Sequence, residues 1–199
     1  MKFPIILISC LLLAACSQVQ VSDGQRAESW RYRQQQLRQI DNWVATGRVA
    51  ITTRDDGWNG TLHWKQFTEG YEIKIIAPFG KGTVMLKGNS AGVTLYPDDE
   101  PPEYSDNATS LLAKRLGWHV PVESLRYWML GLPDPDSNQR DFVIELDDSG
   151  RLSGLVQSGW QVRFLRYQQV NGDELPDKIF LENDKLSVRV VIQNWKLSI

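Results

Sequence analysis

Hydrophobic and polar residues alternate along most of the chain, and the alternation is clearest in residues 71–87. Apolar side chains occupy every second position on both sides of a short turn: Tyr71, Ile73, Ile75, Ala77, Val84 and Leu86. A period of two is typical of strands with one buried face. Pro78 fixes φ before the tip of the turn, and Gly80 and Gly82 permit positive φ after it. Phe79 is therefore expected at the tip of a well-defined turn, where its side chain has no obvious hydrophobic core to pack into. A large apolar side chain in such a place is available to contact a partner.

The same period recurs in further segments, which turn-forming residues such as Asp55-Asp56-Gly57 and Asn171-Gly172 separate. These predicted strands span residues 44–53, 58–67, 92–97, 142–146, 152–157, 160–167, 176–181 and 186–195. The acidic, proline-rich segment 98–103 is expected to end the first group. Ten or eleven strands with no crossover helices between them predict one strongly curved antiparallel sheet, or partial barrel.

Three segments have a helical period instead. The first begins at Glu28 and places four apolar residues near one face: Trp30, Leu37, Ile40 and Val44. The second spans residues 107–116, and Pro121 opens the third. We expect a mainly β protein of the α+β class, an open antiparallel β-barrel of about 11 strands, with the three helices as a lid over one opening.

The first residues have the composition of a secretory signal rather than of a folded domain. A basic start, an apolar run at residues 3–13 that is too short to span a bilayer, and small residues precede Cys16. The sequence Leu13-Ala14-Ala15-Cys16 resembles the bacterial lipoprotein signal, which implies removal of residues 1–15 and an N-acyl and S-diacylglycerol lipid on Cys16. The alternative is a plain signal peptide with an incidental cysteine. Residues 16–27 are then a lipidated cysteine and flexible tether, and residues 28–199 form a single domain.

The cysteines agree with this assignment, since Cys10 and Cys16 are the only two in the chain. Removal of residues 1–15 discards Cys10, so no disulfide is expected in the mature chain. Ser17 follows the lipidated position, and by resemblance to the bacterial sorting rule it indicates the outer membrane. The signal and the exposed Phe79 tip together suggest a lipid-anchored protein of the periplasmic face that works on lipid.

Nothing in the sequence predicts catalysis. The formal net charge of −2 gives no electrostatic case for nucleic acid. His63 and His119 are the only histidines, no nucleophile or phosphate-binding motif is present, and the acidic clusters lack metal-ligand spacing. We expect a binding protein with no metal and no cofactor besides the covalent lipid. A hydrolase that pairs a serine with His63 or His119 is the alternative of the enzyme class.

Several motifs carry a likeness to a known family. They are Ser124-Leu125-Arg126-Tyr127-Trp128-Met129-Leu130-Gly131-Leu132-Pro133, Thr46-Gly47-Arg48, Ala77-Pro78-Phe79-Gly80 and the lipoprotein signal. Together they resemble the LolB family of outer-membrane lipoprotein receptors over nearly the whole mature chain. The resemblance implies an apolar cavity in an open barrel with a helical lid, and a receptor that takes lipoproteins from the periplasmic carrier LolA and releases them into the outer membrane. The family has an exposed leucine, needed for membrane insertion of the cargo, where this chain has Phe79.

The alternating apolar positions and the faces of the helices suggest which residues bind the acyl chains of the cargo, and plain hydrophobic core is the alternative role for all of them. We assign the cavity wall to Ile51, Leu62, Trp64, Ile73, Ile75, Val84 and Leu86, and the lid to Leu112, Leu125, Trp128 and Met129. Pro78, Phe79 and Gly80 form the membrane-insertion tip, with Lys81 placed for anionic headgroups. The expected partners are LolA, cargo lipoproteins and outer-membrane lipid, and the protein itself is expected to be a monomer. The alternative is a scaffolding lipoprotein whose curved sheet binds a protein partner.

Overall fold

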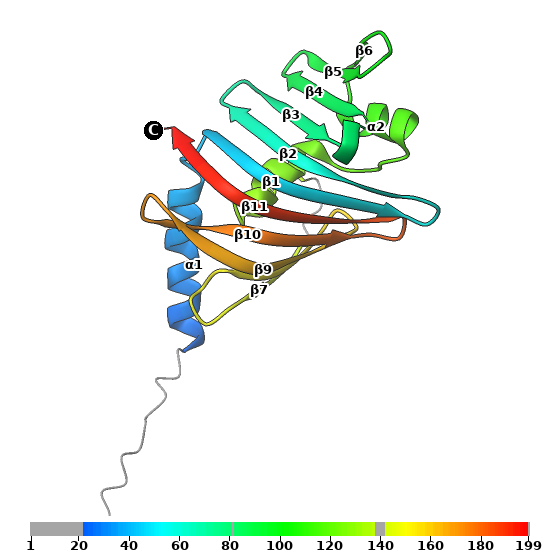
Figure 1. Cartoon of the computed structure of the whole chain (residues 1–199). Helices are drawn as coiled ribbons and strands as arrows, with labels where there is room; N and C mark the ends of the chain where they lie inside the picture. The colour runs from blue at the N-terminus through cyan, green and yellow to red at the C-terminus, as the bar shows by residue number, and fades with distance from the viewer. Residues whose placement is uncertain (1–21, 81, 138–141, 199) are drawn as a thin grey trace, which may run out of the picture.

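The computed structural model describes residues 22–80, 82–137 and 142–198. Within these residues a single sheet contains eleven strands, and every pair of neighbours is antiparallel. The strands are β1 (Asn42–Thr53), β2 (Gly57–Phe67), β3 (Gly70–Ile76), β4 (Thr83–Asn89), β5 (Gly92–Pro97), β6 (Glu103–Ser105), β7 (Val143–Leu146), β8 (Leu152–Gln157), β9 (Trp160–Val170), β10 (Asp173–Glu182) and β11 (Leu186–Ser198). The predicted antiparallel, strongly curved sheet is confirmed (Figure 1).

The sheet consists of two antiparallel meanders that meet at its middle. Strands β6 to β1 follow one another in reverse sequence order, β1 pairs with β11, and β11 to β7 continue to the other edge. The β1–β11 pairing therefore holds the two halves of the chain together, and its register shifts between Thr46 and Gly47. A Cβ on Gly47 would lie 2.0 Å from the main-chain oxygen of Val191, so this close approach of two strands requires glycine.

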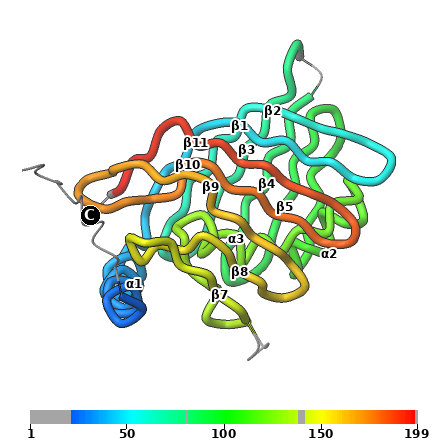
Figure 2. Tube along the Cα trace, turned by 90° about the horizontal axis from the view of Figure 1, so that it is seen from below, coloured from blue at the N-terminus to red at the C-terminus, as the bar shows by residue number. Residues whose placement is uncertain are grey.

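Three helices accompany the sheet: α1 (Asp23–Leu37), α2 (Ala108–Leu116) and α3 (Val122–Met129). Figure 2 shows α2 and α3 on the concave side of the sheet, whereas α1 lies at a separate position beside the strands of the second half. The buried apolar side chains of the sheet and the helices form one core, which includes Trp30 and Leu37 of α1.

The first helix differs from the sequence-based expectation at both ends. It begins at Asp23 instead of Glu28, because Ser22 and Gln25 form a capping box that satisfies the first free N–H groups. It ends at Leu37, so Val44 belongs to β1, which extends to Asn42. The last part of the predicted flexible tether, residues 23–27, is therefore helical. The segment expected to end the first group of strands also reaches β6, which is a short edge strand.

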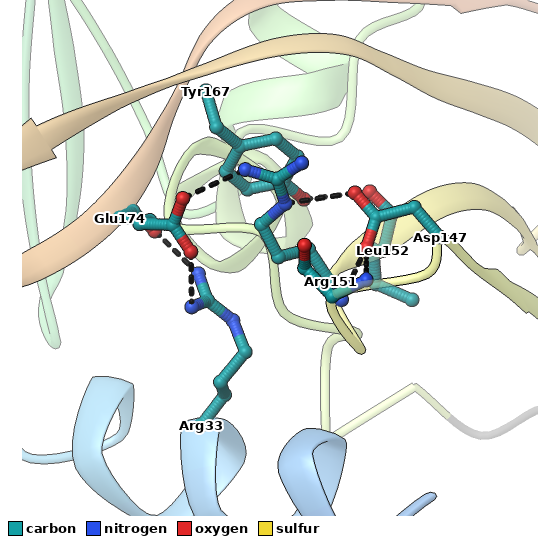
Figure 3. A network of polar contacts seen from close by, with 7 residues as sticks. Arg33, Asp147, Arg151, Leu152, Tyr167 and Glu174 are labelled. Carbon is teal, nitrogen blue, oxygen red and sulfur yellow. Dashed lines mark hydrogen bonds and ion pairs between the residues drawn. The ribbon is translucent and has the colours of Figure 1, made fainter. Parts of the chain in front are cut away.

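A network of polar contacts fastens α1 to the second half of the sheet (Figure 3). Arg33 donates to a carboxylate oxygen of Glu174 at 3.2 Å and to the main-chain oxygen of the same residue at 2.6 Å. The other carboxylate oxygen of Glu174 accepts from Arg151 at 2.7 Å, and the Arg151 guanidinium lies 4.8 Å from the centre of the Tyr167 ring. These charge-assisted bonds orient α1 against β10 and the turn between β7 and β8.

Candidate functional site

An apolar cavity lies between the concave face of the sheet and the two helices α2 and α3. It contains about 80 Å³ of free space. All residues that line it are hydrophobic: Val49, Ile51, Leu62, Trp64, Ile73, Ile75, Val84, Leu86, Leu112, Trp118, Val120, Val122, Leu125, Met129, Val188 and Val190. A space without a polar partner for water is suited to an apolar ligand.

Most of the predicted cavity and lid residues meet here. The structure brings together Ile51, Leu62, Trp64, Ile73, Ile75, Val84, Leu86, Leu112, Leu125 and Met129, while Trp128 is absent from the lining. The alternation therefore identified correctly which face of each of these strands points into the molecule. Whether these residues bind acyl chains stays a prediction.

Trp128 has a different place from the one predicted for it. Its indole is fully buried, and its Nε1–H donates to the side-chain oxygen of Gln157 at 2.9 Å. The same oxygen accepts from the main-chain N–H of Asp134, and the amide group of Gln157 donates back to the main-chain oxygen of Asp134, both at 2.9 Å. Trp128 thus attaches α3 to β8 through Gln157. Leu125 and Met129 lie on the neighbouring side of the helix, which faces the cavity.

The lining contains six residues that the sequence-based assignment missed: Val49, Trp118, Val120, Val122, Val188 and Val190. Val49 shares the period of Ile51, so the alternation in β1 could have found it. Val188 and Val190 also alternate, but only the pairing of β11 with β1 brings them beside the first half of the sheet. Trp118 and Val120 lie in the short link between α2 and α3, where no period exists to identify them.

The cavity is small in this structure. Pockets for drug-sized ligands enclose roughly 300–1,000 Å³, several times the observed space of about 80 Å³. A long apolar ligand can enter only if the surrounding elements move apart. The short helices α2 and α3 are the elements best suited to move, since neither belongs to the hydrogen-bonded sheet.

The tip between β3 and β4 is the second feature of the candidate site. The side chain of Phe79 is 97% exposed, and its backbone has a φ of 58° in the left-handed region. The main-chain N–H of Ala77 donates to the oxygen of Gly82 at 2.9 Å and closes the loop. Figure 2 shows this loop projecting away from α2 and α3, beyond the outer side of the sheet. The left-handed conformation costs a phenylalanine about 1–2 kcal/mol, so the fold accepts a cost to present this ring to solvent.

The remaining predicted features do not meet at the cavity. His63 has the sheet position opposite to the inward-facing Leu62, and His119 is exposed in the link between the helices. Within the described ranges, no cluster of three metal-binding side chains occurs. The helices in those ranges are too short or too polar to cross a bilayer. The predicted lipidation site Cys16 and the headgroup contact Lys81 lie outside the described residues.

Comparison with known proteins gives matches over nearly the whole chain. Residues 41–195 match the family described as "Outer membrane lipoprotein LolB". The chain is 42% identical to "Outer-membrane lipoprotein LolB" of Nitrosococcus oceani, over 98% of each chain. It is 35% identical to the protein of that name from Pseudomonas aeruginosa, over 93% of this chain and 91% of the relative.

Solved structures with the same fold are much more distant in sequence. A putative outer membrane lipoprotein-sorting protein domain from Vibrio parahaemolyticus superposes with a TM-score of 0.55 at 12% identity, over 86% of this chain and 93% of that chain. A LolA superfamily protein from Nitrosomonas europaea gives a TM-score of 0.51 at 11% identity, over 85% and 94%. At such identities these likenesses support the open-sheet architecture with its helices and no more.

Proposed function

Because this chain belongs to the LolB family of outer-membrane lipoproteins, we propose that it is a receptor that accepts lipoproteins from the periplasmic carrier LolA and inserts them into the outer membrane. The observation that carries this proposal is the cavity under α2 and α3, whose lining is hydrophobic throughout. The function is binding and transfer rather than catalysis. The Cys16 lipid would hold the protein at the periplasmic face of that membrane, where it acts as a monomer.

The physical basis of acceptance is burial of the acyl chains. Each methylene group removed from water contributes about 0.8 kcal/mol, so a free lipoprotein needs an apolar site at every stage of its transfer. Hydrophobic side chains such as Leu62 and Ile75 offer this environment on one side of the cavity, and Leu125 and Met129 offer it on the other. Transfer then proceeds by increasing affinity from carrier to receptor to bilayer, without nucleotide.

Acceptance requires the cavity to open. The acyl chains need far more volume than the free space of about 80 Å³, so this narrow cavity would correspond to the receptor before cargo enters. Trp128 keeps one flank of α3 bound to Gln157, whereas Leu125 and Met129 on the other flank face the free space. We therefore expect α2 and the free flank of α3 to move away from β2 and β3, with the Trp128 contact kept.

The exposed tip is suited to the release step. Phe79 presents its whole ring to solvent, between Pro78 and Gly80, on a loop that projects beyond the sheet. An aromatic ring on such a loop partitions favourably into the interfacial region of a bilayer. Entry of Phe79 into the membrane would bring the receptor close enough for the cargo to pass into the lipid.

The experiment that tests this function uses the mature chain from residue 16 with Cys16→Ser, which cannot be acylated. It is mixed with LolA preloaded with a lipoprotein, without nucleotide, and pull-down measures where the cargo resides. We expect the cargo on this protein. A cargo that stays on a competent carrier would contradict the receptor function.

A second arm adds liposomes and separates acceptance from release. Phe79→Glu should still accept cargo but insert it at least about tenfold more slowly, because a charge opposes entry of the tip into the bilayer. Phe67→Glu is the matched control, since Phe67 is also an exposed aromatic residue but lies at a different turn, at the end of β2. Equal insertion by both variants would remove the tip from the mechanism.

A further inference from the structure

A groove on the outer face of the sheet passes beneath the base of the Phe79 tip. About 360 Å³ of space lies between strands β1, β2 and β11, the end of β3 at Ile76, and Ala77 and Pro78 at the base of the tip. The backbone of Gly60 forms part of its floor, where β2 and β3 approach each other closely. Its lining includes the outward-facing Arg48, Thr61 and Arg189, so the groove lies on the side of the sheet opposite to the apolar cavity.

Two arginines give this groove its charge. Arg48 of β1 and Arg189 of β11 both line it and are both exposed. Because Ala50 pairs with Arg189 and Arg48 pairs with Val191, the two guanidinium groups belong to diagonal neighbours on adjacent strands and the same face. Thr61 and Asn59 of β2 add polar groups to the lining.

Within the described part of the chain, neither arginine forms an ion pair with a carboxylate. Their direct cross-strand neighbours are uncharged as well, since Thr61 and Val191 oppose Arg48, and Ala50 and Phe180 oppose Arg189. Arg189 lies over the ring of Phe180, with its guanidinium carbon 5.9 Å from the ring centre, and this contact leaves its N–H donors free to meet an anion. Both arginines can thus bind an external anion. Two adjacent guanidinium groups fit the oxygens of a phosphate through parallel N–H donors.

We propose that this groove, which we name the outer groove, binds the phosphate of an anionic phospholipid headgroup when the protein meets the membrane. The proposal rests on the proposed contact of Phe79 with lipid, and the position of the groove supports it. Pro78 lines the groove and is the direct neighbour of Phe79, so a headgroup beneath the tip lies beside the inserted ring. The tip projects on the same outer side of the sheet (Figure 2).

The outer groove would orient the receptor on the membrane. A single apolar tip lets the molecule rotate about it, whereas a second, electrostatic contact fixes which face of the sheet meets the lipid. With the outer face toward the headgroups, α2 and α3 lie on the far side of the sheet from the membrane. The lid then stays accessible to the carrier while the tip is in contact with lipid.

The test measures partition of the Cys16→Ser mature chain onto vesicles of phosphatidylethanolamine and phosphatidylglycerol at low salt. Arg48→Gln and Arg189→Gln should each lower the partition coefficient about fivefold, and the double variant about 25-fold. Arg31→Gln on the exposed side of α1 removes the same charge away from the outer groove and should change it little. The differences should vanish in 1 M salt, where the Debye length is ~3 Å.

Further arms separate the possible outcomes. The double replacement by lysine keeps the charge but loses the paired donors, so its partition should lie between the wild type and the glutamine variants. Equal partition by the Arg48→Gln, Arg189→Gln and Arg31→Gln variants would overturn the proposal, while a loss in Phe79→Glu in the same assay would leave the tip function intact. Tight binding of inorganic phosphate without vesicles, lost in the double variant, would mean a free-anion site and would also overturn it. Unchanged partition with weakened capture of LolA would assign the arginines to a protein partner instead.

Discussion

The two halves of the sheet use their concave faces differently. Strands β1 to β4 each contribute two residues to the apolar cavity, and beneath them the space is not filled. Strands β8 to β10 contribute none, and their inward side chains are buried in a continuous core: Leu152, Trp160, Val162, Phe164, Ile179 and Leu181. We call these the cavity half and the filled half.

The difference shows how one curved sheet can be both stable and adaptable. The filled half is fixed by Trp128 and Gln157 under the sheet and by the contacts of Arg33 with Glu174 at its end. In the described residues, the lining of the cavity opposite the sheet comes from α2, α3 and the link between them. A ligand can therefore displace the cover of one half while the other half keeps the fold together.

The largest expected effect is on the contact that joins α3 to the filled half. Trp128→Ala should lower the free energy of unfolding by about 3–5 kcal/mol, because a large buried ring is lost. Trp128→Phe should cost less, about 1–3 kcal/mol, because part of the buried ring is lost and the oxygen of Gln157 keeps only the N–H of Asp134 as a donor. Urea unfolding of the non-acylated mature chain measures both. A loss below about 1 kcal/mol in Trp128→Ala would contradict the role of this residue as the attachment of α3.

A smaller effect on the free energy of unfolding is expected for two leucines that are almost equally buried, one in each half. Leu181 of the filled half is 1% exposed and Leu62 of the cavity half is 4% exposed. Leu181→Ala should cost about 4 kcal/mol and Leu62→Ala about 2 kcal/mol, since Leu62 already borders free space and has fewer contacts to lose. The same urea experiment measures the pair. Equal costs would mean that the two halves are packed alike.

The smallest effect concerns alkaline pH and two tyrosines, Tyr71 in the cavity half and Tyr167 in the filled half. Burial raises the pKa of both hydroxyls, and the nearby carboxylate of Glu123 raises the pKa of Tyr71 further. The native state therefore keeps these protons at a pH where the unfolded chain releases them, so stability is complete below about pH 10 and falls above it.

The slope is at most ~1.4 kcal/mol per pH unit for each tyrosine, and smaller for the partly exposed Tyr71. Tyr71→Phe should make the fall between pH 10 and 11 shallower. Tyr167→Phe should do so more strongly, although it also loses the hydroxyl bond to the main-chain oxygen of Leu152 at 2.6 Å. Urea titrations at several pH values measure the slope, and an unchanged slope in both variants would show that other groups cause it.

The local patterns of the sequence were sufficient for the strands other than the short edge strand β6, and for most of their inward-facing residues. Alternation in the strands placed Leu62 and Ile75 on the inner side, because a period of two leaves only one choice once a buried face is known. The proline and glycines that flank Phe79 predicted its exposed position at a turn. The positive φ, however, occurs at Phe79 itself as well as at Gly82. The start of α1 was wrongly predicted at Glu28, although Ser22 and Gln25 have the spacing of a capping box that could have placed it.

The long-range arrangement could not be predicted in this manner. A helical period shows that Trp128, Leu125 and Met129 are apolar neighbours, but only the tertiary structure shows that Trp128 contacts β8 while the other two face free space. The pairing of β1 with β11 likewise joins residues far apart in sequence, so it determined that Val188 and Val190 line the cavity and that Arg48 lies near Arg189. The volume of the cavity depends on all of these contacts together.

The central claim is that the cavity half binds acyl chains, and titration with a fluorescent fatty acid tests it most directly. Val84→Phe adds bulk to the cavity lining, whereas Val156→Phe adds the same bulk on an exposed position of β8 in the filled half. The account predicts saturable binding by the wild type and Val156→Phe, and at least about tenfold weaker binding by Val84→Phe, with both variants folded. Absence of saturable binding by the wild type, or equal affinity in the two variants, would contradict it and favour a scaffolding lipoprotein that binds a protein partner through its sheet.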